Sequence, residues 1–365
     1  MLVEHKVNLN ILENLKYYSV LELCENNSLT LDIIKIFFKE NRNLFFDLKV
    51  QGNSPLHILT INNNPQKFEM FKYLIEGGLQ INLKNENGIT PLHNICLNES
   101  FSFEQLNYMI EKNSEINLKS NQGEIALHFL CRNQNCTYEA IKLLIEKNSL
   151  INIQNNQNGD TPLHLLCKNQ NVSVEMVKCF VENLADLNFE SCYIKSPLQD
   201  ACCNSNFDVV KFLIEYNSNT PLEPKNNGKK TPLYLSLFNE DISTLMIQYL
   251  IEKKMVFNLE HMKDKNLNSP LHSLCKSKNI CFQMIKYLVE NKCDLNEKNE
   301  FGENSFHLAC FNDKITIETV KSMIEIKADI NAKNFKGHVP FIFIKNKEMR
   351  EELSKEYFPN KKINF

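Results

Sequence analysis

Apolar and polar positions along the chain follow one pattern that returns about every 35 residues. One clear copy has a polar turn at 157–160, after which the run from Thr161 to Cys167 reads Thr-Pro-Leu-His-Leu-Leu-Cys and predicts a short first helix. A second apolar run at 173–181 predicts a second helix, which Leu187 and Asn188 connect to the next turn. The positions equivalent to Thr161, called anchors below, are Ser54, Thr90, Ile125, Ser196, Thr231, Ser269, Asn304 and Val339.

Neighbouring anchors are 35 or 36 residues apart, except for one step of 38 residues between Thr231 and Ser269. A fixed period of this length is typical of a stacked repeat array, in which each unit packs on its neighbours. The pattern therefore predicts an all-α solenoid of helix-turn-helix units joined by short β-hairpin loops, called fingers below.

Three residue types recur around the anchors. A Gly stands two residues before most anchors, where a tight turn requires a positive φ, and Gly159 is an example. A Pro after the anchor suits the first helical turn, and we predict this role for Pro55, Pro91, Pro162, Pro197, Pro232 and Pro270. A His follows the anchor by three residues at His57, His93, His128, His164, His272 and His307.

A turn with Gly, a Thr-Pro-Leu-His run, two apolar helices and a Leu-Asn pair resemble the ankyrin repeat, whose unit has about 33 residues and a Thr-Pro-Leu-His core. The resemblance extends from about Tyr18 to about Glu356. It departs from the family pattern in two ways, since the usual Gly between the helices is absent and the loop there is two residues longer in most copies. The resemblance implies that the His side chains bond turn backbone and that the chain binds other proteins.

We expect one continuous solenoid with three parts. Residues 1–50 form a degenerate N-terminal capping repeat, residues 51–336 form the ankyrin repeat array, and residues 337–365 form a C-terminal capping repeat and tail. Terminal repeats with a polar outer face are what such arrays require at their ends.

Composition and charge argue against membrane insertion, secretion and nucleic acid binding. Of 365 residues, 43% are hydrophobic, but no apolar run approaches the roughly 20 residues that span a bilayer, so we expect no membrane insertion. We recognise no secretory signal, and 13 cysteines then favour a reducing compartment, the cytoplasm in the first instance, with the nucleus or delivery into a host cell as alternatives. The net charge of −3 and the pairing of regularly spaced Lys with acids argue against nucleic acid binding.

Five His-x-x-Cys pairs suggest metal binding as an alternative, since both residue types ligate zinc and a spacing of three places them on one helical face. The pairs are His93/Cys96, His128/Cys131, His164/Cys167, His272/Cys275 and His307/Cys310. Adjacent helices lie roughly 8–10 Å apart, too far for two pairs to share an ion with bonds of about 2.0–2.3 Å. We therefore favour buried cysteines that fill the core, no metal and no cofactor.

We expect no enzyme activity. A cysteine nucleophile requires a base and an orienting third group, and the repeated pairs offer only the first two. Among the cysteines that lie off the core position, we expect partial exposure for Cys136, Cys192, Cys203, Cys281 and Cys293.

The resemblance implies a partner surface on the finger tips and the groove side of the first helices. In the C-terminal half these positions hold Tyr193, Lys195, Phe238, Lys265, Lys276, Phe301, Phe311 and Phe335. Because interface hot spots favour aromatic residues, we expect a protein partner to dock there. The function we expect is that of a non-catalytic scaffold or adaptor, monomeric by itself; the alternatives are an inhibitor that occludes a partner enzyme and a metal or redox sensor.

Overall fold

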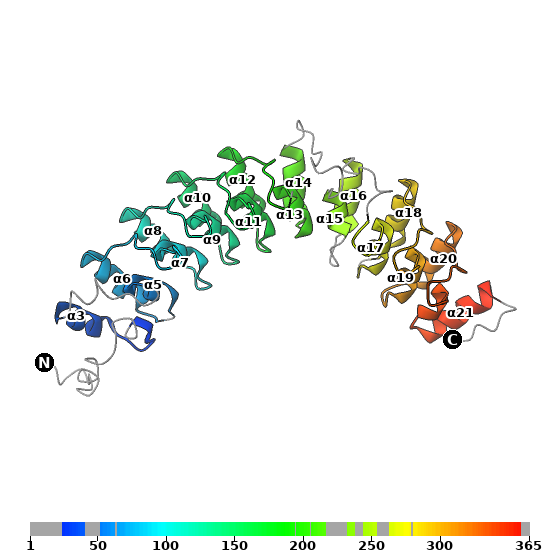
Figure 1. Cartoon of the computed structure of the whole chain (residues 1–365), viewed down its shortest axis with the longest axis horizontal. Helices are drawn as coiled ribbons and strands as arrows, with labels where there is room; N and C mark the ends of the chain where they lie inside the picture. The colour runs from blue at the N-terminus through cyan, green and yellow to red at the C-terminus, as the bar shows by residue number, and fades with distance from the viewer. Residues whose placement is uncertain are drawn as a thin grey trace. The chain divides into compact units, whose positions relative to one another are not determined.

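The computed structural model describes residues 24–40, 52–62, 64–193, 195–204, 206–216, 232–237, 244–253, 263–278 and 280–358. The chain divides into two compact units, Met1–Tyr193 and Ile194–Phe365. Each unit is a stack of helix pairs (Figure 1), so the expectation of an all-α helical-repeat fold is confirmed. Over the described ranges, extended pairing is limited to the single bridge residue Asn53, and no helix is long and apolar enough to cross a membrane.

The N-terminal unit contains α3 (Leu31–Glu40) and four complete pairs. These pairs are α5 (Pro55–Ile61) with α6 (Lys67–Glu76), α7 (Pro91–Leu97) with α8 (Phe103–Glu111), α9 (Ala126–Arg132) with α10 (Tyr138–Glu146), and α11 (Pro162–Lys168) with α12 (Val174–Glu182). First helices pack on neighbouring first helices, as α7 does on α9, and second helices on second helices, as α10 does on α12.

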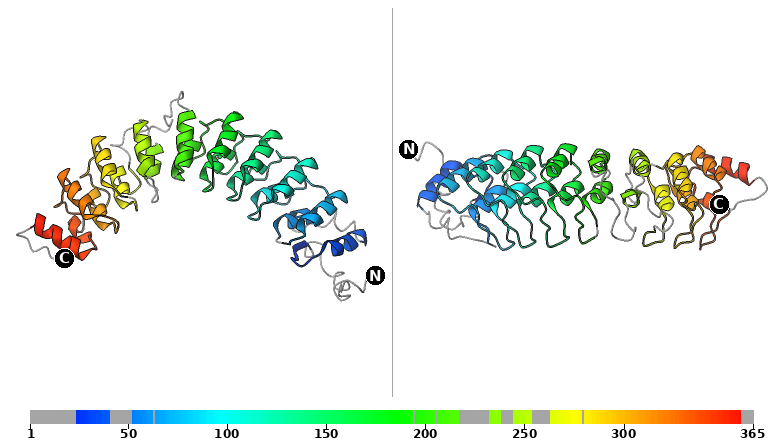
Figure 2. Two further views of the ribbon diagram at one scale, coloured as in Figure 1. Left: turned by 180° about the vertical axis from the view of Figure 1, so that it is seen from behind. Right: turned by 90° about the horizontal axis from the view of Figure 1, so that it is seen from above.

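The C-terminal unit repeats this order. Its elements are α13 (Pro197–Cys203) with α14 (Phe207–Tyr216), α15 (Pro232–Leu237) with α16 (Thr244–Glu252), α17 (Pro270–Lys276) with α18 (Phe282–Glu290), α19 (Ser305–Phe311) with α20 (Ile317–Glu325), and the 3-10 helix η2 (Pro340–Phe343) with α21 (Lys347–Tyr357). In both units the fingers project from one side of the helical layers, as the right-hand view of Figure 2 shows.

The start of each first helix is fixed by the anchor and the His three residues later. In α7, the Thr90 N–H donates to Nδ1 of His93 over 2.9 Å, and the Thr90 hydroxyl accepts from the His93 N–H. Nε2 of His93 then donates to the Leu118 carbonyl over 3.0 Å, in the approach to the next finger. Each such imidazole therefore caps its own helix and ties two repeats together.

In most repeats, the same position of the first helix holds a cysteine in the interior of the stack. Cys24, Cys96, Cys131, Cys167, Cys202, Cys275 and Cys310 occupy it, and all are buried. Burial raises the pKa of the Cys24 thiol to about 12 and that of the Cys131 thiol well above its usual value. These thiols are core residues, as the repeat position predicts.

The fingers are tight turns closed by backbone hydrogen bonds, such as those from the Asn85 N–H to the Ile89 carbonyl and from the Gly88 N–H to the Asn85 carbonyl, each over 2.9 Å. Gly88 lies in the turn with a φ of 71°, and a Cβ there would lie 2.7 Å from the backbone nitrogen of Asn121 in the next finger. Adjacent fingers are joined because the Asn121 N–H donates to the Asn87 carbonyl over 3.0 Å. A glycine is thus required both by the turn and by the close approach of its neighbour.

The finger before Ser269 has no glycine in its turn. In the segment before Ser269 that is lengthened by three residues, Leu267 takes the equivalent place and adopts a φ of 57°. Residues 258–262 of this insertion lie outside the described part of the chain.

Asparagine side chains form a series of links between repeats that our sequence analysis missed. At the end of α11, the Asn169 amide donates to the carbonyls of Cys131 and Asn133 in the preceding repeat, over 3.0 and 2.8 Å. In the C-terminal unit, Asn312 makes the same two bonds to Cys275 and Ser277. A second series, expected only to mark the return from the second helix, also links repeats: the Asn117 amide donates to the Asn148 carbonyl and accepts from the Leu150 N–H.

The C-terminal helix α21 is held by charge and by one apolar contact. Lys321 of α20 pairs with Glu352 and Glu356 of α21 over 3.2 and 2.9 Å, whereas we expected it to pair with the acid at the start of its own helix. Leu353 is the buried residue of α21. The other expected Lys pairs are mixed: Lys35 lies 3.9 Å from Asp32, the acid three residues earlier, but Lys142 and Lys178 reach forward to Glu146 and Glu182.

Candidate functional site

The predicted partner-binding residues differ in accessibility. Three phenylalanines of the C-terminal unit are exposed: Phe301 by 53%, Phe311 by 56% and Phe335 by 77%. Lys265 and Lys276 are also exposed, and Tyr193, at the end of the N-terminal unit, is 59% exposed. Phe238 lies outside the described residues.

Phe301 and Phe335 lie on adjacent fingers. The Phe335 N–H donates to the Phe301 carbonyl over 3.0 Å, so the two backbones are in direct contact. The Phe335 ring lies over Gly302, where an added Cβ would come within 2.7 Å of the ring. Phe335 therefore packs against the neighbouring finger and still leaves most of its surface free.

Phe311, at the end of α19, belongs to an aromatic cluster centred on Phe343. The Phe343 ring centroid lies 6.2 Å from that of Phe311, 6.1 Å from His307 and 6.0 Å from His338. The ammonium of Lys345 lies 5.3 Å from the Phe311 ring centroid and pairs with Asp313 over 2.8 Å. Our sequence analysis missed Phe343, although it stands four residues after the last anchor on the same first-helix surface.

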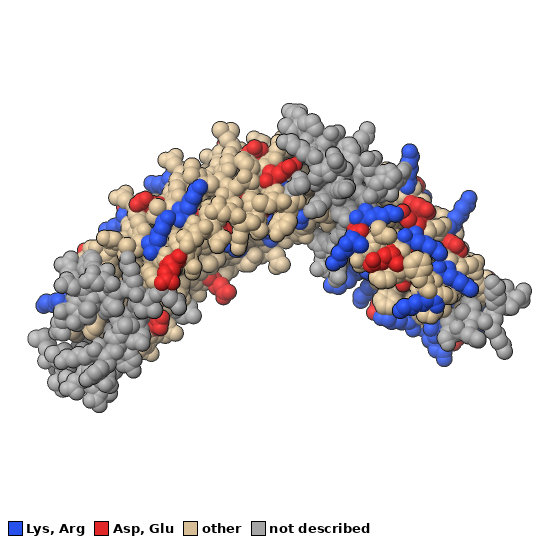
Figure 3. All heavy atoms as spheres, in the orientation of Figure 1, with Lys and Arg blue, Asp and Glu red and all other residues tan. Residues whose placement is uncertain are grey.

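The predicted partner-binding lysines also differ in accessibility. Lys195 has only 26% of its side chain exposed, with its ammonium 3.9 Å from a carboxylate oxygen of the buried Asp200 and donating to Sγ of Cys203. Lys263 pairs with Glu297 over 2.6 Å. On the face shown in Figure 3, Lys and Arg side chains gather over the C-terminal unit, with acids among them. Lys265 and Lys276 are the two predicted lysines that lie open to a partner.

In the N-terminal unit, buried acids on the fingers pair with cations at the ends of the first helices. Asp160 is 1% exposed and receives two bonds from the Lys168 ammonium, over 2.7 and 2.8 Å. Glu124 pairs with Arg132 and accepts from the Asn155 amide over 3.0 Å. Burial acts to raise the pKa of Glu124, but Arg132 and Asn155 outweigh it and lower that pKa. We missed these pairs, whose only signal is an acid followed by a base eight residues later.

The His-x-x-Cys pairs do not present metal ligands. In the pair of His128 and Cys131, Nδ1 accepts from the Ile125 N–H over 3.2 Å and Nε2 lies 3.3 Å from the Asp160 carbonyl. Burial lowers the pKa of His128 to about 4, so the ring is neutral with both nitrogens engaged. Within the described ranges, no three His, Cys, Asp or Glu side chains come together as a metal site would require.

The cysteines outside the core position are less accessible than we expected. Cys136 and Cys293 are buried, which corrects the expectation of partial exposure; the Asn169 amide of the next repeat donates to Sγ of Cys136 over 3.7 Å. Cys203 and Cys281 are half-buried and Cys192 is exposed.

Comparisons with known proteins agree with this architecture. A family model described as "Ankyrin repeats (3 copies)" matches residues 1–119, 61–155, 127–223 and 257–334. No curated protein matches the chain. The chain is similar to the crystal structure of the human ASB11 ankyrin repeat domain, with 19% identity and a TM-score of 0.49 over 62% of this chain and 95% of that one. Because the family model covers most of the sequence, the chain belongs to the ankyrin repeat family, which generally serves protein–protein interaction and whose fold is typically non-catalytic.

Proposed function

We propose that this protein is a non-catalytic scaffold or adaptor that binds a protein partner through the C-terminal unit. The observation that carries the proposal is the exposure of Phe301, Phe311 and Phe335 on the fingers and first helices of adjacent repeats. Large aromatic side chains exposed together are costly to leave in water and are enriched among interface hot spots.

The surroundings of these rings suit a protein surface. Lys265 and Lys276 add positive charge on the preceding repeat, and Lys345 lies against Phe311. An apolar centre with a charged rim is the usual composition of an interface. The partner that fits best carries apolar side chains flanked by acidic residues.

The test is a double substitution, Phe301→Ala with Phe311→Ala, measured by titration of the partner that the wild-type chain captures. We expect the affinity to fall at least 100-fold, because each buried aromatic hot spot contributes about 2 kcal/mol or more. The matched control is Ile61→Ala with Leu97→Ala, which removes two exposed apolar side chains from the same first-helix position in the N-terminal unit. An unchanged affinity in the first variant, with loss in the control, would contradict the proposal.

Two other functions are separable by experiment. An activity assay on the captured partner distinguishes a scaffold from an inhibitor, because only an inhibitor suppresses catalysis. Elemental analysis and thiol titration test the metal or redox sensor. We expect the buried thiols to react only after unfolding, since a thiol whose pKa is raised by burial is a poor nucleophile.

A further inference from the structure

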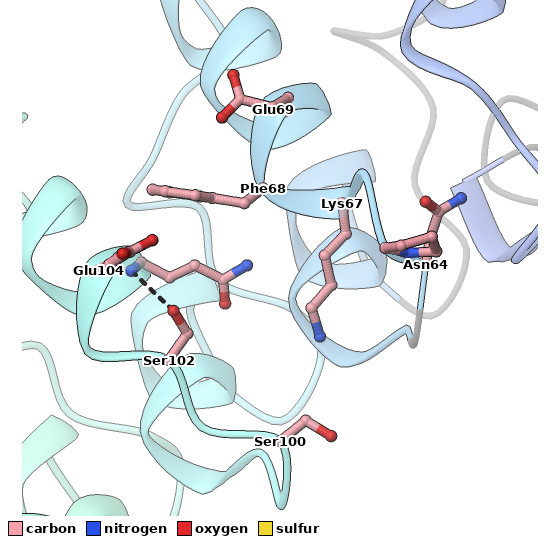
Figure 4. Close-up of a pocket in the computed structure, with 9 residues that line it drawn as sticks. Asn64, Lys67, Phe68, Glu69, Ser100, Ser102 and Glu104 are labelled. Atoms are coloured by element: carbon pink, nitrogen blue, oxygen red, sulfur yellow. Dashed lines mark hydrogen bonds between the residues drawn. The ribbon is translucent and has the colours of Figure 1, made fainter.

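A surface hollow of about 620 Å³ lies in the N-terminal unit between the start of α6 and the start of α8 (Figure 4). Lys67 and Phe68 of α6 line one side, and Ser100, Ser102 and Gln105 line the other. The hollow lies at the turns between paired helices, at the opposite end of the first helices from the fingers. It is thus separate from the proposed partner surface, and its size is within the range of about 300–1,000 Å³ that holds small ligands.

Two lining residues depart from the repeat pattern. Gln105 is the third residue of α8, a position that the other second helices of the described chain fill with buried, mostly apolar side chains: Met70, Ala140, Met176, Val209, Met246, Met284 and Thr319. Lys67 stands where α8, α10 and α12 have their Ser or Thr N-cap. Both departures therefore face the same hollow.

The Gln105 side chain is 3% exposed, yet its amide makes no hydrogen bond with any described residue. The amide atoms keep contact with the solvent of the hollow, so this group is suited to a ligand that both donates and accepts. A peptide group has that chemistry.

Lys67 supplies the second recognition element. Its ammonium donates to the Asn62 carbonyl over 2.7 Å, which leaves two of its three N–H donors, and no acid of the described chain lies within ion-pair distance. Burial lowers the pKa of Lys67, an effect that a carboxylate in the hollow would offset. Because Glu104 and the Lys72-paired Glu69 lie nearby, a singly charged carboxylate suits the hollow better than a phosphate.

The geometry points to a second binding site, in which an extended acidic peptide segment places a peptide group on Gln105 and an Asp or Glu carboxylate on Lys67. Phe68 forms an apolar wall beside it. The site is independent of the C-terminal surface, so the loss of either leaves the other intact.

The test uses the full chain and a capped pentapeptide, Ala-Ala-Asp-Ala-Ala, with the Ala-Ala-Asn-Ala-Ala peptide as its neutral match. The readout is the side-chain amide resonance of Gln105 in a two-dimensional NMR titration. We expect a saturable shift with the acidic peptide and at least tenfold weaker binding of the neutral one. Lys67→Met should abolish that preference, and Gln105→Met, read from backbone resonances of 100–106, should weaken binding of both peptides at least tenfold.

The Gln105→Met variant also tests whether the Gln105 amide lacks a hydrogen-bond partner within the protein. Met occupies this position in four other repeats, so the Tm should be unchanged or higher; a clear fall would show that the amide is bonded within the protein and would overturn the proposal. Absence of a saturable shift, or equal binding by Gln105→Met, would also overturn it. So would an equally strong response to inorganic phosphate, since that would identify a general anion site.

Discussion

One repeat position, seven residues after the anchor, carries different chemistry in α9 and α11 of the N-terminal unit and in α19 of the C-terminal unit. In the N-terminal unit, the ends of α9 and α11 carry Arg132 and Lys168, which pair with buried acids on the fingers. In the C-terminal unit, the end of α19 carries Phe311 instead, and its ring is exposed beside Phe343 and Lys345. The same backbone thus supports a charge-paired side chain in α9 and α11 and an exposed aromatic ring in α19. Other repeats differ again, with Ile61 and Leu97 at this position in the N-terminal unit and Lys276 in the C-terminal unit.

The two units also differ in net charge. Residues 1–193 hold 16 Lys and Arg against 22 Asp and Glu, a net of −6, whereas residues 194–365 hold 25 against 22, a net of +3, which together give the −3 of the chain. The His and Asn side chains bond the backbone in both units, so the repeat is kept while the charge of surface positions differs.

The largest change in stability is expected when the ion pair of Arg132 and Glu124 is broken. Replacing Arg132 by Phe leaves Glu124 buried with only the Asn155 amide as a described partner, so we expect a loss of about 2–3 kcal/mol in unfolding free energy. The value lies below that for a wholly buried pair because 41% of the Arg132 side chain is exposed. Urea denaturation measures the change, and Arg132→Lys is the control that keeps the charge. Equal stability of the Phe and wild-type proteins would contradict the structural role of the pair.

The reverse exchange brings the N-terminal chemistry to the C-terminal unit. Phe311→Arg places a cation eight residues after Glu303, as Arg132 stands after Glu124, and removes a proposed hot spot. We expect partner affinity to fall about 10–100-fold, with stability changed by no more than about 1 kcal/mol. Calorimetric titration and denaturation measure the two effects. Phe311→Leu keeps an apolar side chain and should lose less affinity. Equal losses in both variants would show that the added positive charge at position 311 does not weaken binding.

Acid should destabilise both units through their histidines. Burial lowers the pKa of His93 and His128 to about 4, and it lowers those of His272 and His307. Below the unfolded pKa of about 6.5 the unfolded chain binds protons that the folded chain excludes, so stability is full at higher pH and falls as the pH drops from 6.5 toward 4. Between pH 7.5 and 5.5 each deeply shifted histidine should cost about 1.4 kcal/mol, measured by denaturation at several pH values.

The chain provides a matched control for that measurement. Gln199 replaces the His in α13, where its side-chain oxygen accepts from the Ser196 N–H over 2.8 Å. His128→Gln should therefore keep the cap and remove about 1.4 kcal/mol of the pH dependence. An unchanged pH profile would show that His128 is not a source of it.

The smallest change in stability is expected from substitutions at the positive-φ position of the fingers, which is Leu267 in one finger and Gly88 in another. Leu267→Gly should stabilise the protein by about 0.5 kcal/mol, because relief of the left-handed backbone slightly exceeds the added entropy of the unfolded chain. Gly88→Ala should act in the opposite direction, since an added Cβ would clash with Asn121. Thermal unfolding of the two variants gives the comparison, and stabilisation by both would refute the argument from φ.

The sequence by itself determined the repeat, its period and its caps, because these depend on local contacts. Thr90, Pro91 and His93 act within one turn of helix, and Gly88 acts within one turn of the finger, so their spacing is visible along the chain. The buried cysteines were predictable for the same reason, since a position repeated in every first helix meets the same neighbours each time.

Only the tertiary structure decided what each surface position does. Asn169 reaches back more than 30 residues to the Cys131 carbonyl, and Lys321 pairs with Glu352 rather than with an acid of its own helix. The Gln105 amide likewise looks unremarkable in sequence, and only the packing of α6 beside α8 leaves it buried in a hollow without a described partner. These outcomes depend on distances between repeats, and a one-dimensional pattern of polar and apolar residues does not contain those distances.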